Sequence, residues 1–186
     1  MKEFVISLLK TNVPLFYYFH TFEHTLYVME KAIEIGENEN CSEHEMELLS
    51  AAALWHDTGY IKIYFGHEEE SCIMAQRYLP EYGYSPDEIN KICGMIMATK
   101  IPQSPKNKLE EIIADADLEY LATSKAAFFS EKLYRELHYR NQSLTQEMWN
   151  EKQILFLQNH KYFTKYCIKN KTPQKLLYLK QLIEEK

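Results

Sequence analysis

Residues 42–59 read SEHEMELLSAAALWHDTG, and this segment indicates a helical fold. Ser42 is followed three residues later by Glu45, and this capping box is the signature of a helix N-terminus. The helix that it starts continues through apolar residues to the pair His56-Asp57. An aspartate at the end of such an apolar run is drawn into a mostly buried region, where charges are rarely tolerated unless they are paired or bound to a metal. The stretch therefore predicts a helix whose end carries the Asp57 carboxylate into a mostly buried region.

Turn-forming residues separate amphipathic segments along the rest of the chain, as a helical bundle requires. Gly36 ends a long segment that begins at Pro14, and Ser85-Pro86 with Glu88 forms a second capping box with proline at the first helical position. We predict an all-α fold, a single helical bundle of roughly seven helices that spans residues 1–186 as one domain. The predicted helical segments are residues 14–35, 42–55, 67–79, 85–96, 109–121, 125–140, 143–160 and 173–186, and residues 100–108 form the clearest loop.

The charge balance limits the classes of partner. The 186 residues include 21 Lys+Arg and 27 Asp+Glu, which gives a formal net charge of −6. This argues against a polynucleotide partner, because no surplus of cations exists to displace counterions from phosphates. A small phosphorylated substrate stays compatible, since a metal ion can supply local positive charge. The low content of 5 Gly and 6 Pro argues against an all-β sandwich, which needs many turns.

No segment is typical of a membrane span or an export signal. No uninterrupted apolar run approaches the ~20 residues needed to cross a bilayer. The four cysteines, at positions 41, 72, 93 and 167, are scattered without a C-x-x-C pair. We therefore expect reduced thiols in a cytoplasmic protein without a membrane partner. Nothing in the sequence indicates an oligomeric state.

Two further clusters accompany the His-Asp pair. His20 and His24 stand four residues apart, just over one helical turn, so both imidazoles would project from one face of a helix. Asp115 and Asp117 interrupt an apolar helical segment, and at least one of them must face inward. Each cluster alone has an ordinary alternative as surface or core residues, but together they predict a His/His/Asp/Asp metal site. Such ligands suit a divalent ion: Mn²⁺, Fe²⁺, Zn²⁺, Co²⁺ or Ni²⁺, with Mg²⁺ as a further candidate nearby.

The order His … His-Asp … Asp on an all-α scaffold resembles the HD-domain superfamily of metal-dependent phosphohydrolases. The runs HTFEHTLYV (20–28), AAALWHDTG (51–59) and DADL (115–118) resemble its first metal-binding helix, its His-Asp helix and its final acidic motif. The segments GHEEES (66–71) and 156–163 are similar to a group of uncharacterised bacterial HD proteins. The resemblance covers about residues 14–165.

The resemblance implies that His24, His56, Asp57 and Asp117 hold the metal and that Asp57 is essential for catalysis. Asp117 is preferred because the last ligand of the superfamily usually follows a small residue and precedes a Leu-rich helical segment. Asp115 fits nearly as well, since it follows Ala114.

Two more histidines have implied roles, each with an alternative. His20 matches the residue that protonates the leaving group in the cyclic-nucleotide phosphodiesterase branch; its alternative is to support the metal site or pack a helix. Branches with two protein-bound metals add histidines before the last Asp, and only His67 lies in that interval here. One metal is therefore favoured over two, although His67 with a Glu of its helix could hold a second ion; its alternative is to begin that helix. The glycine-tyrosine-proline motif of cyclic-dinucleotide phosphodiesterases is missing, since Thr58 follows the His-Asp pair.

The expected activity is hydrolysis of a small phosphoester, such as a nucleotide or cyclic nucleotide, by water that the metal activates. Lys62, Arg77 and Lys100 are the cations nearest to the motifs and are candidates for neutralising phosphate; the alternative for each is a solvated surface charge. Tyr17, Tyr18 and Tyr60 lie near the implied ligands in the sequence and could line a pocket; the alternative, packing in a helical core, is favoured. Two other functions are possible for this fold: a non-catalytic sensor that binds a nucleotide or partner, and a di-iron oxygenase, which needs more ligands than the chain offers.

Overall fold

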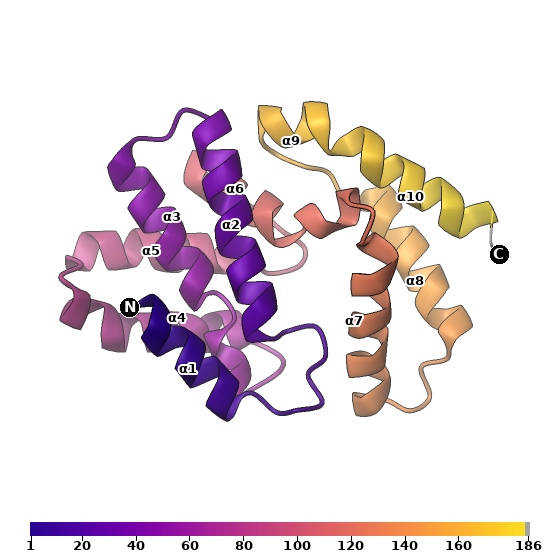
Figure 1. Cartoon of the computed structure of the whole chain (residues 1–186), viewed down its shortest axis with the longest axis horizontal. Helices are drawn as coiled ribbons and strands as arrows, with labels where there is room; N and C mark the ends of the chain where they lie inside the picture. The colour runs from indigo at the N-terminus through magenta and orange to yellow at the C-terminus, as the bar shows by residue number, and fades with distance from the viewer. Residues whose placement is uncertain (185–186) are drawn as a thin grey trace.

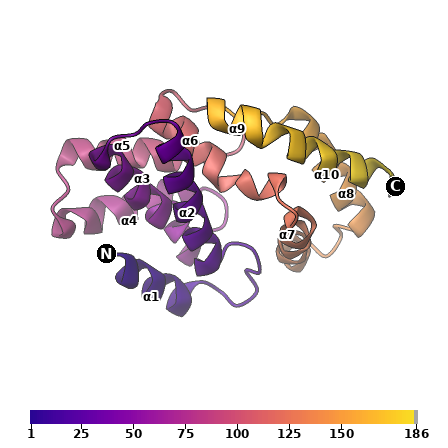
Figure 2. The same cartoon turned by 45° about the horizontal axis from the view of Figure 1, so that its top comes forward.

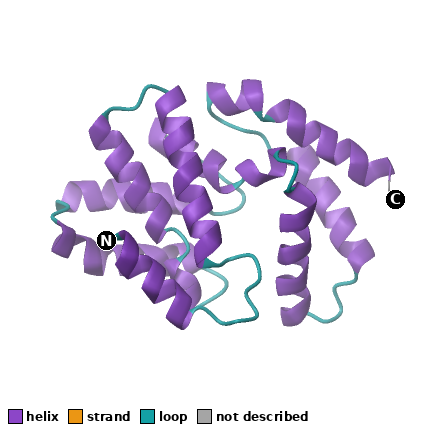
Figure 3. Cartoon of the chain, viewed as in Figure 1, coloured by secondary structure: helices purple, strands orange, loops and turns teal. Residues whose placement is uncertain are grey.

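Helices account for all regular secondary structure in residues 1–184, the part of the chain that this computed structural model describes (Figure 3). The α-helices are α1 (Lys2–Asn12), α2 (Phe22–Asn38), α3 (Glu43–Trp55), α4 (His67–Tyr78), α5 (Pro86–Ala98), α6 (Lys108–Asp117), α7 (Ala126–Arg140), α8 (Gln146–Asn159), α9 (Lys165–Asn170) and α10 (Thr172–Glu184). The short 3-10 helices are η1 (Thr58–Ile61), η2 (Leu79–Tyr82) and η3 (Glu119–Ala122). The all-α prediction is confirmed. Within residues 1–184, none of these helices combines the length and the apolar character needed to cross a bilayer.

Both capping boxes are present where the sequence predicts them. The Ser42 hydroxyl accepts a hydrogen bond from the backbone N–H of Glu45, whose carboxylate accepts one from the Ser42 N–H at 2.8 Å. Ser85 and Glu88 repeat this arrangement at the start of α5. Each box satisfies two backbone donors that a helix N-terminus would otherwise leave unpaired.

The prediction of roughly seven helices was too low for the described residues, which form ten α-helices. Two helices were not predicted: α1, whose Val5 and Leu9 are four residues apart and both buried, and the short α9. One predicted helix begins too early, because α2 starts at Phe22 rather than Pro14 and residue 21 is extended with φ −115° and ψ 169°. The final helix was predicted to reach residue 186, and its last two positions lie outside the described residues.

The helices form two groups that meet along η3. Helices α1 to α6 form the first group, and α7 to α10 lie beside it on the C-terminal side (Figures 1 and 2). In the first group α2 packs against α3 and α6, around a core that includes Val28, Ile35, Leu49 and Trp55. The second group has its own apolar cluster, which includes Leu157. The chain passes from one group to the other directly after α6, so a residue at the end of α6 lies close to both.

A polar network joins α9 and η3 to α2. Glu34 accepts hydrogen bonds from the Lys31 amine and the Tyr166 hydroxyl, both at 2.8 Å, and the Lys171 amine lies 3.4 Å from it. Lys171 also forms an ion pair with the buried Glu119 carboxylate of η3. Burial acts to raise the pKa of Glu34, but these donors outweigh burial and lower the pKa to about 2.

The network predicts a pH-dependent part of the stability. The pKa of Glu34 falls from its ordinary 4.5 to about 2 on folding, so its contribution is fully present above pH 4.5 and is lost as the pH falls toward 2. We expect Glu34→Gln to lower the free energy of unfolding by about 1 kcal/mol at pH 7. In urea titrations from pH 7 to pH 3, the difference from wild type should shrink below pH 4.5.

The matched control is Glu37→Gln, at an exposed position on the same helix. It should change stability little at every pH. A Glu34→Gln deficit that stays constant from pH 7 to pH 3 would contradict the assignment.

Candidate metal centre

Three helix ends bring His24, His56 and Asp117 together. His24 lies in the first turn of α2, His56 follows the last residue of α3, and Asp117 is the last residue of α6. One ligand atom of each lies within 4.8 Å of the other two. Asp117 Oδ1 is 3.0 Å from His24 Nε2 and 3.7 Å from His56 Nε2. Two imidazole nitrogens and a carboxylate oxygen thus face one another, as the donor atoms around a cation do.

Asp57 adds a second carboxylate to this cluster. Its Oδ2 atom lies 3.2 Å from His56 Nε2 and 3.7 Å from His24 Nε2. His56 Nε2 and Asp57 Oδ2 are close but are not oriented as donor and acceptor, and among the described residues neither atom has a hydrogen-bond partner. Buried polar atoms without partners are rare in folded proteins. Two such atoms in a cluster of nitrogen and oxygen donors fit the coordination of a divalent metal ion.

The histidine tautomer supports the same interpretation. The His56 Nδ1–H donates a hydrogen bond to the Ala53 carbonyl at 2.7 Å, which leaves Nε2 as the atom available to a metal.

The pKa values of the cluster show how its charges interact. Burial acts to lower the pKa of His56, but the Asp57 and Asp117 carboxylates outweigh it and raise the pKa to about 9. Burial likewise acts to raise the pKa of Asp57, and the imidazoles of His56 and His67 outweigh it and hold the pKa well below its ordinary value. The cluster therefore attracts positive charge.

Gly59 allows the link after the His-Asp pair to pack against the start of α4. A Cβ atom on Gly59 would lie 2.0 Å from the His67 carbonyl oxygen, so only glycine fits. This close approach places His67 Nε2 at 3.4 Å from Asp57 Oδ1, while His67 Nδ1 faces the Tyr64 carbonyl at 3.2 Å. Tyr60 stacks on the His67 ring at 3.8 Å between centroids. Two of the residues singled out from the sequence, His67 and Tyr60, thus lie beside the cluster.

The structure corrects the prediction that His20 and His24 project from one helix face. Because α2 begins at Phe22, His20 precedes the helix and approaches the cluster from the loop. Its ring is held by Glu136 of α7, whose Oε1 atom is 2.5 Å from His20 Nδ1, and its Nε2 atom lies 3.1 Å from the Tyr60 hydroxyl. Burial acts to lower the pKa of His20, but the Glu136 carboxylate outweighs it and raises the pKa.

Glu136 was not predicted as a site residue from the sequence. It is fully buried and also accepts hydrogen bonds from the backbone N–H groups of Phe19 and His20, at 2.9 and 3.1 Å, and from the Tyr64 hydroxyl at 3.1 Å. Its only signal in the sequence is an acid beside apolar Leu137. Such a carboxylate, buried and paired with a histidine 116 positions away, fixes the orientation of that histidine.

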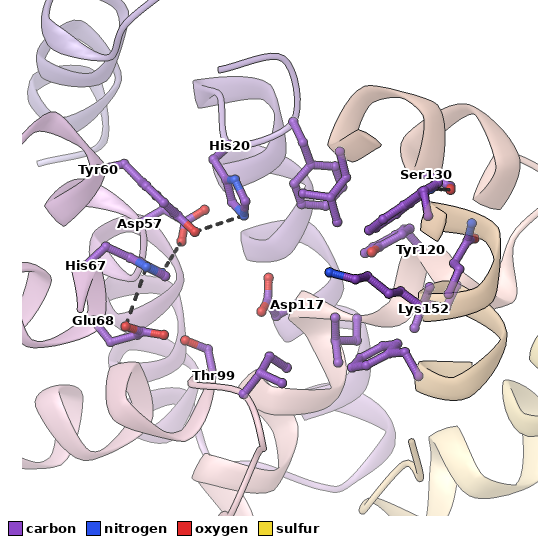
Figure 4. Close-up of a pocket in the computed structure, with 18 residues that line it drawn as sticks. His20, Asp57, Tyr60, His67, Glu68, Thr99, Asp117, Tyr120, Ser130 and Lys152 are labelled. Atoms are coloured by element: carbon purple, nitrogen blue, oxygen red, sulfur yellow. Dashed lines mark hydrogen bonds and ion pairs between the residues drawn. The ribbon is translucent and has the colours of Figure 1, made fainter. Parts of the chain in front are cut away.

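These residues form one wall of a cavity of about 330 Å³. Asp57, Asp117, His20, His67 and Glu68 line this wall, and side chains of η3, α7 and α8 line the opposite wall (Figure 4). The volume lies within the range of small-molecule sites, about 300–1,000 Å³. The polar cluster is therefore accessible to a ligand from inside the cavity.

Comparison with known proteins gives the family. The family model described as HD domain matches residues 21–119, more than half of the chain. The chain belongs to the HD-domain family. Among curated proteins, no sequence matches it significantly.

Two solved structures share the fold of this HD-domain protein. One is the crystal structure of a predicted HD superfamily hydrolase from an uncultured Thermotogales bacterium: it is 18% identical, the match covers 98% of this chain and 89% of that chain, and the TM-score is 0.66. The other is the crystal structure of Bacillus subtilis YpgQ in complex with ADP: it is 15% identical, with 100% and 97% of the two chains covered and a TM-score of 0.66. At these identities the likeness concerns the fold alone.

Within the HD domain, Asp115 and Asp117 have different surroundings. Asp115 is fully buried, and it accepts hydrogen bonds from the Phe163 and Thr164 backbone N–H groups, both at 2.9 Å, and from the Thr164 hydroxyl at 2.7 Å. Burial raises its pKa to about 6 against these bonds. The structure does not bring it into the His24–His56 cluster, because both carboxylate oxygens hold the segment before α9.

The three cations proposed from the sequence do not line the cavity of the HD domain. Lys62 pairs with Glu70, Lys100 pairs with Glu69, and the Arg77 guanidinium lies over the Tyr78 ring at 5.3 Å.

The cation that does line the cavity is Lys152 of α8, and Figure 4 shows its amine directed across the space toward Asp117. Sequence proximity failed here because α8 reaches the site only through the packing of the two helix groups.

The different surroundings of the two aspartates lead to opposite expectations for Asp115→Asn and Asp117→Asn. Asp115→Asn should lower the free energy of unfolding by about 2 kcal/mol, since an amide cannot accept all three hydrogen bonds, and should leave metal content unchanged. Asp117→Asn should abolish metal retention and keep most of the stability. Metal analysis of dialysed protein and urea unfolding measure the two effects, and loss of metal from Asp115→Asn alone would reverse the assignment.

Proposed function

We propose that this HD-domain protein is a metal-dependent phosphohydrolase that acts on a small phosphorylated substrate. The observation that carries the proposal is the meeting of His24, His56, Asp57 and Asp117, with His56 Nε2 and Asp57 Oδ2 left without hydrogen-bond partners among the described residues. The cavity beside the cluster gives a substrate access to it. The ADP bound to the similarly folded YpgQ is consistent with a phosphorylated ligand.

The four side chains would hold one divalent ion, and Mn²⁺, Fe²⁺, Zn²⁺, Co²⁺, Ni²⁺ and Mg²⁺ remain candidates. Such an ion supplies Lewis-acid activation of a water molecule and of a phosphoryl oxygen. His67 Nε2 lies 3.4 Å from Asp57 Oδ1, and the buried Glu68 follows His67 in the sequence. These groups would hold a second ion. The His56 hydrogen bond to the Ala53 carbonyl keeps that ligand nitrogen directed at the site.

We assign to His20 the protonation of the departing oxygen. The short contact between its Nδ1–H and Glu136 fixes the ring, and this leaves Nε2 on the cavity side, where it meets the Tyr60 hydroxyl. The negative charge of Glu136 favours the protonated imidazole, which is the form that can donate. Glu136 is a positioning residue, because it acts on the reaction only through His20.

The test of the metal-dependent hydrolase is Asp57→Ala. We expect this variant to keep its helical circular dichroism, to lose metal on dialysis and to lose hydrolysis of a panel of nucleotides, cyclic nucleotides and sugar phosphates supplied with Mn²⁺. Asp87→Ala, at an exposed position of α5, is the matched control and should keep both properties.

Full hydrolysis by Asp57→Ala would refute the proposal. If the wild-type protein binds metal tightly but hydrolyses no member of the panel, the non-catalytic sensor replaces it. Tightly bound iron with an oxygen-dependent reaction would instead indicate a di-iron oxygenase.

The proposed acid role of His20 predicts a dependence on the leaving group. An alkyl phosphate needs a proton on its departing oxygen, whereas 4-nitrophenyl phosphate releases a stable anion. His20→Gln should therefore slow hydrolysis of the alkyl ester by about 10²–10⁴-fold and affect the nitrophenyl ester far less. Glu136→Gln should show the same selective loss with a smaller factor. Equal loss on both esters would show that the two residues have only a structural role.

A further inference from the structure

The wall of the cavity opposite the metal centre is apolar and largely aromatic. It is built by the segment around η3 and by α7 and α8, and Phe19 of the loop before α2 joins it to the metal centre, because its ring contacts both Tyr120 and His24. The side chains that give it this character are Phe19, Tyr120, Leu121, Leu133, Trp149 and Phe156. Most of this wall lies outside residues 21–119, the part that the HD-domain family model matches. An apolar wall of this kind suits the organic part of a ligand, not its phosphate.

Gln153 places one fixed polar group in this apolar wall. Its side chain is 6% exposed, and its Oε1 atom accepts a hydrogen bond from the Tyr178 hydroxyl at 2.5 Å. This bond fixes the amide so that its N–H₂ group is the remaining donor, and among the described residues that group has no hydrogen-bond partner. Gln153 lines the cavity, and its N–H₂ group is not among the fully buried atoms without partners, so this group is open to the cavity and can donate to an acceptor on a ligand.

Trp149 and Ser130 complete the rigid part of the wall. The Trp149 indole N–H donates a hydrogen bond to the Ser130 hydroxyl at 3.0 Å, and both residues are more than nine-tenths buried. The only polar group of the indole is therefore already used. Trp149 can offer a ligand nothing but its apolar ring surface, which favours a flat partner.

Lys152, next to Gln153 on α8, supplies the positive charge of the cavity. Of the described residues that line the cavity, it is the only lysine or arginine. Figure 4 shows that its amine crosses the space toward Asp117 without an ion pair being drawn to it. Lys152 thus stands between the apolar wall and the metal centre, where the phosphate of a bound molecule would lie.

We propose that the wall formed by η3, α7 and α8 is the subsite for the organic group of the substrate. The ligand class is a phosphorylated compound whose organic group is a flat, mostly apolar ring that carries a hydrogen-bond acceptor. Gln153 is the residue that recognises the acceptor, and Lys152 holds the phosphate. The phosphate end of this inference rests on the proposed function, whereas the ring end rests on the cavity wall alone.

A matched pair of phosphonates tests the subsite, because their C–P bond is not a phosphoester and binding is measured without turnover. In 4-acetylbenzylphosphonate the ring carries a carbonyl acceptor, and in 4-ethylbenzylphosphonate a methylene group replaces that carbonyl. Butylphosphonate has no ring. Isothermal titration calorimetry with the Mn²⁺-loaded protein should show the acetyl compound binding on the order of 5-fold more tightly than the ethyl compound, and butylphosphonate most weakly.

Variants of α8 separate the two roles. Gln153→Met should bring the ratio of the acetyl to the ethyl affinity to about 1. If the Met variant fails to fold, Gln153→Glu takes its place: it offers an acceptor instead of the donor and should reverse the preference. Lys152→Met should weaken both aromatic phosphonates by the same factor and leave their ratio unchanged. Gln158→Met, at an exposed position on the same helix, is the control and should bind as wild type does.

The subsite is overturned if the acetyl preference survives in Gln153→Met, or if butylphosphonate binds as tightly as the ethyl compound. These outcomes differ from failure of the hydrolase proposal. If the protein shows the predicted phosphonate selectivity but hydrolyses no phosphoester, the subsite proposal stands and the hydrolase proposal is refuted. If the protein hydrolyses phosphoesters without this selectivity, the hydrolase proposal stands and the subsite proposal is refuted.

Discussion

Burial of Asp57 beside two imidazoles that also face Asp117 is the constraint on which the rest of the structure depends. A buried carboxylate costs free energy unless a positive charge or hydrogen bonds compensate it. In this protein the imidazoles of His56, His67 and His24 lie 3.2, 3.4 and 3.7 Å from the Asp57 carboxylate, and two of the converging atoms have no hydrogen-bond partner among the described residues. Buried polar atoms without partners destabilise a fold unless a ligand compensates them, so this arrangement suits a cation site better than a purely structural role. The helix ends form the frame that holds these side chains in place.

The frame itself was largely predictable from the sequence, because its signals are local. The capping box at Ser42, the apolar run after it and Gly59 all act within one segment, and each is present as predicted or has a direct steric reason. The start of α2 was not predictable in the same way. Pro14 is a common first residue of a helix, but residues 14–21 form a loop that carries His20 to Glu136, and tertiary contacts override the local signal.

The acidic motif at the end of α6 shows where sequence reasoning reaches its limit. Asp115 and Asp117 are equivalent by composition and by apolar neighbours, so the sequence offers only a preference between them. The structure distinguishes them by what lies opposite: Thr164, 49 positions later, offers a backbone N–H and a hydroxyl to Asp115, whereas His24 faces Asp117. Which carboxylate meets which partner is a property of helix packing, and no local pattern encodes it.

Glu136 and Lys152 were missed for the same reason, and both come from the C-terminal helices. The part of the chain that the HD-domain family model matches contributes His24, His56 and Asp117, while α7 and α8 contribute the carboxylate behind His20 and the cation of the cavity. A small displacement of α7 and α8 relative to α2 would change the contacts of His20 and Lys152 together, and would leave the distances among His24, His56 and Asp117 intact. Because the two sets of residues belong to different helix groups, the proposed substrate subsite can change without any change in the cluster that is proposed to hold the cation.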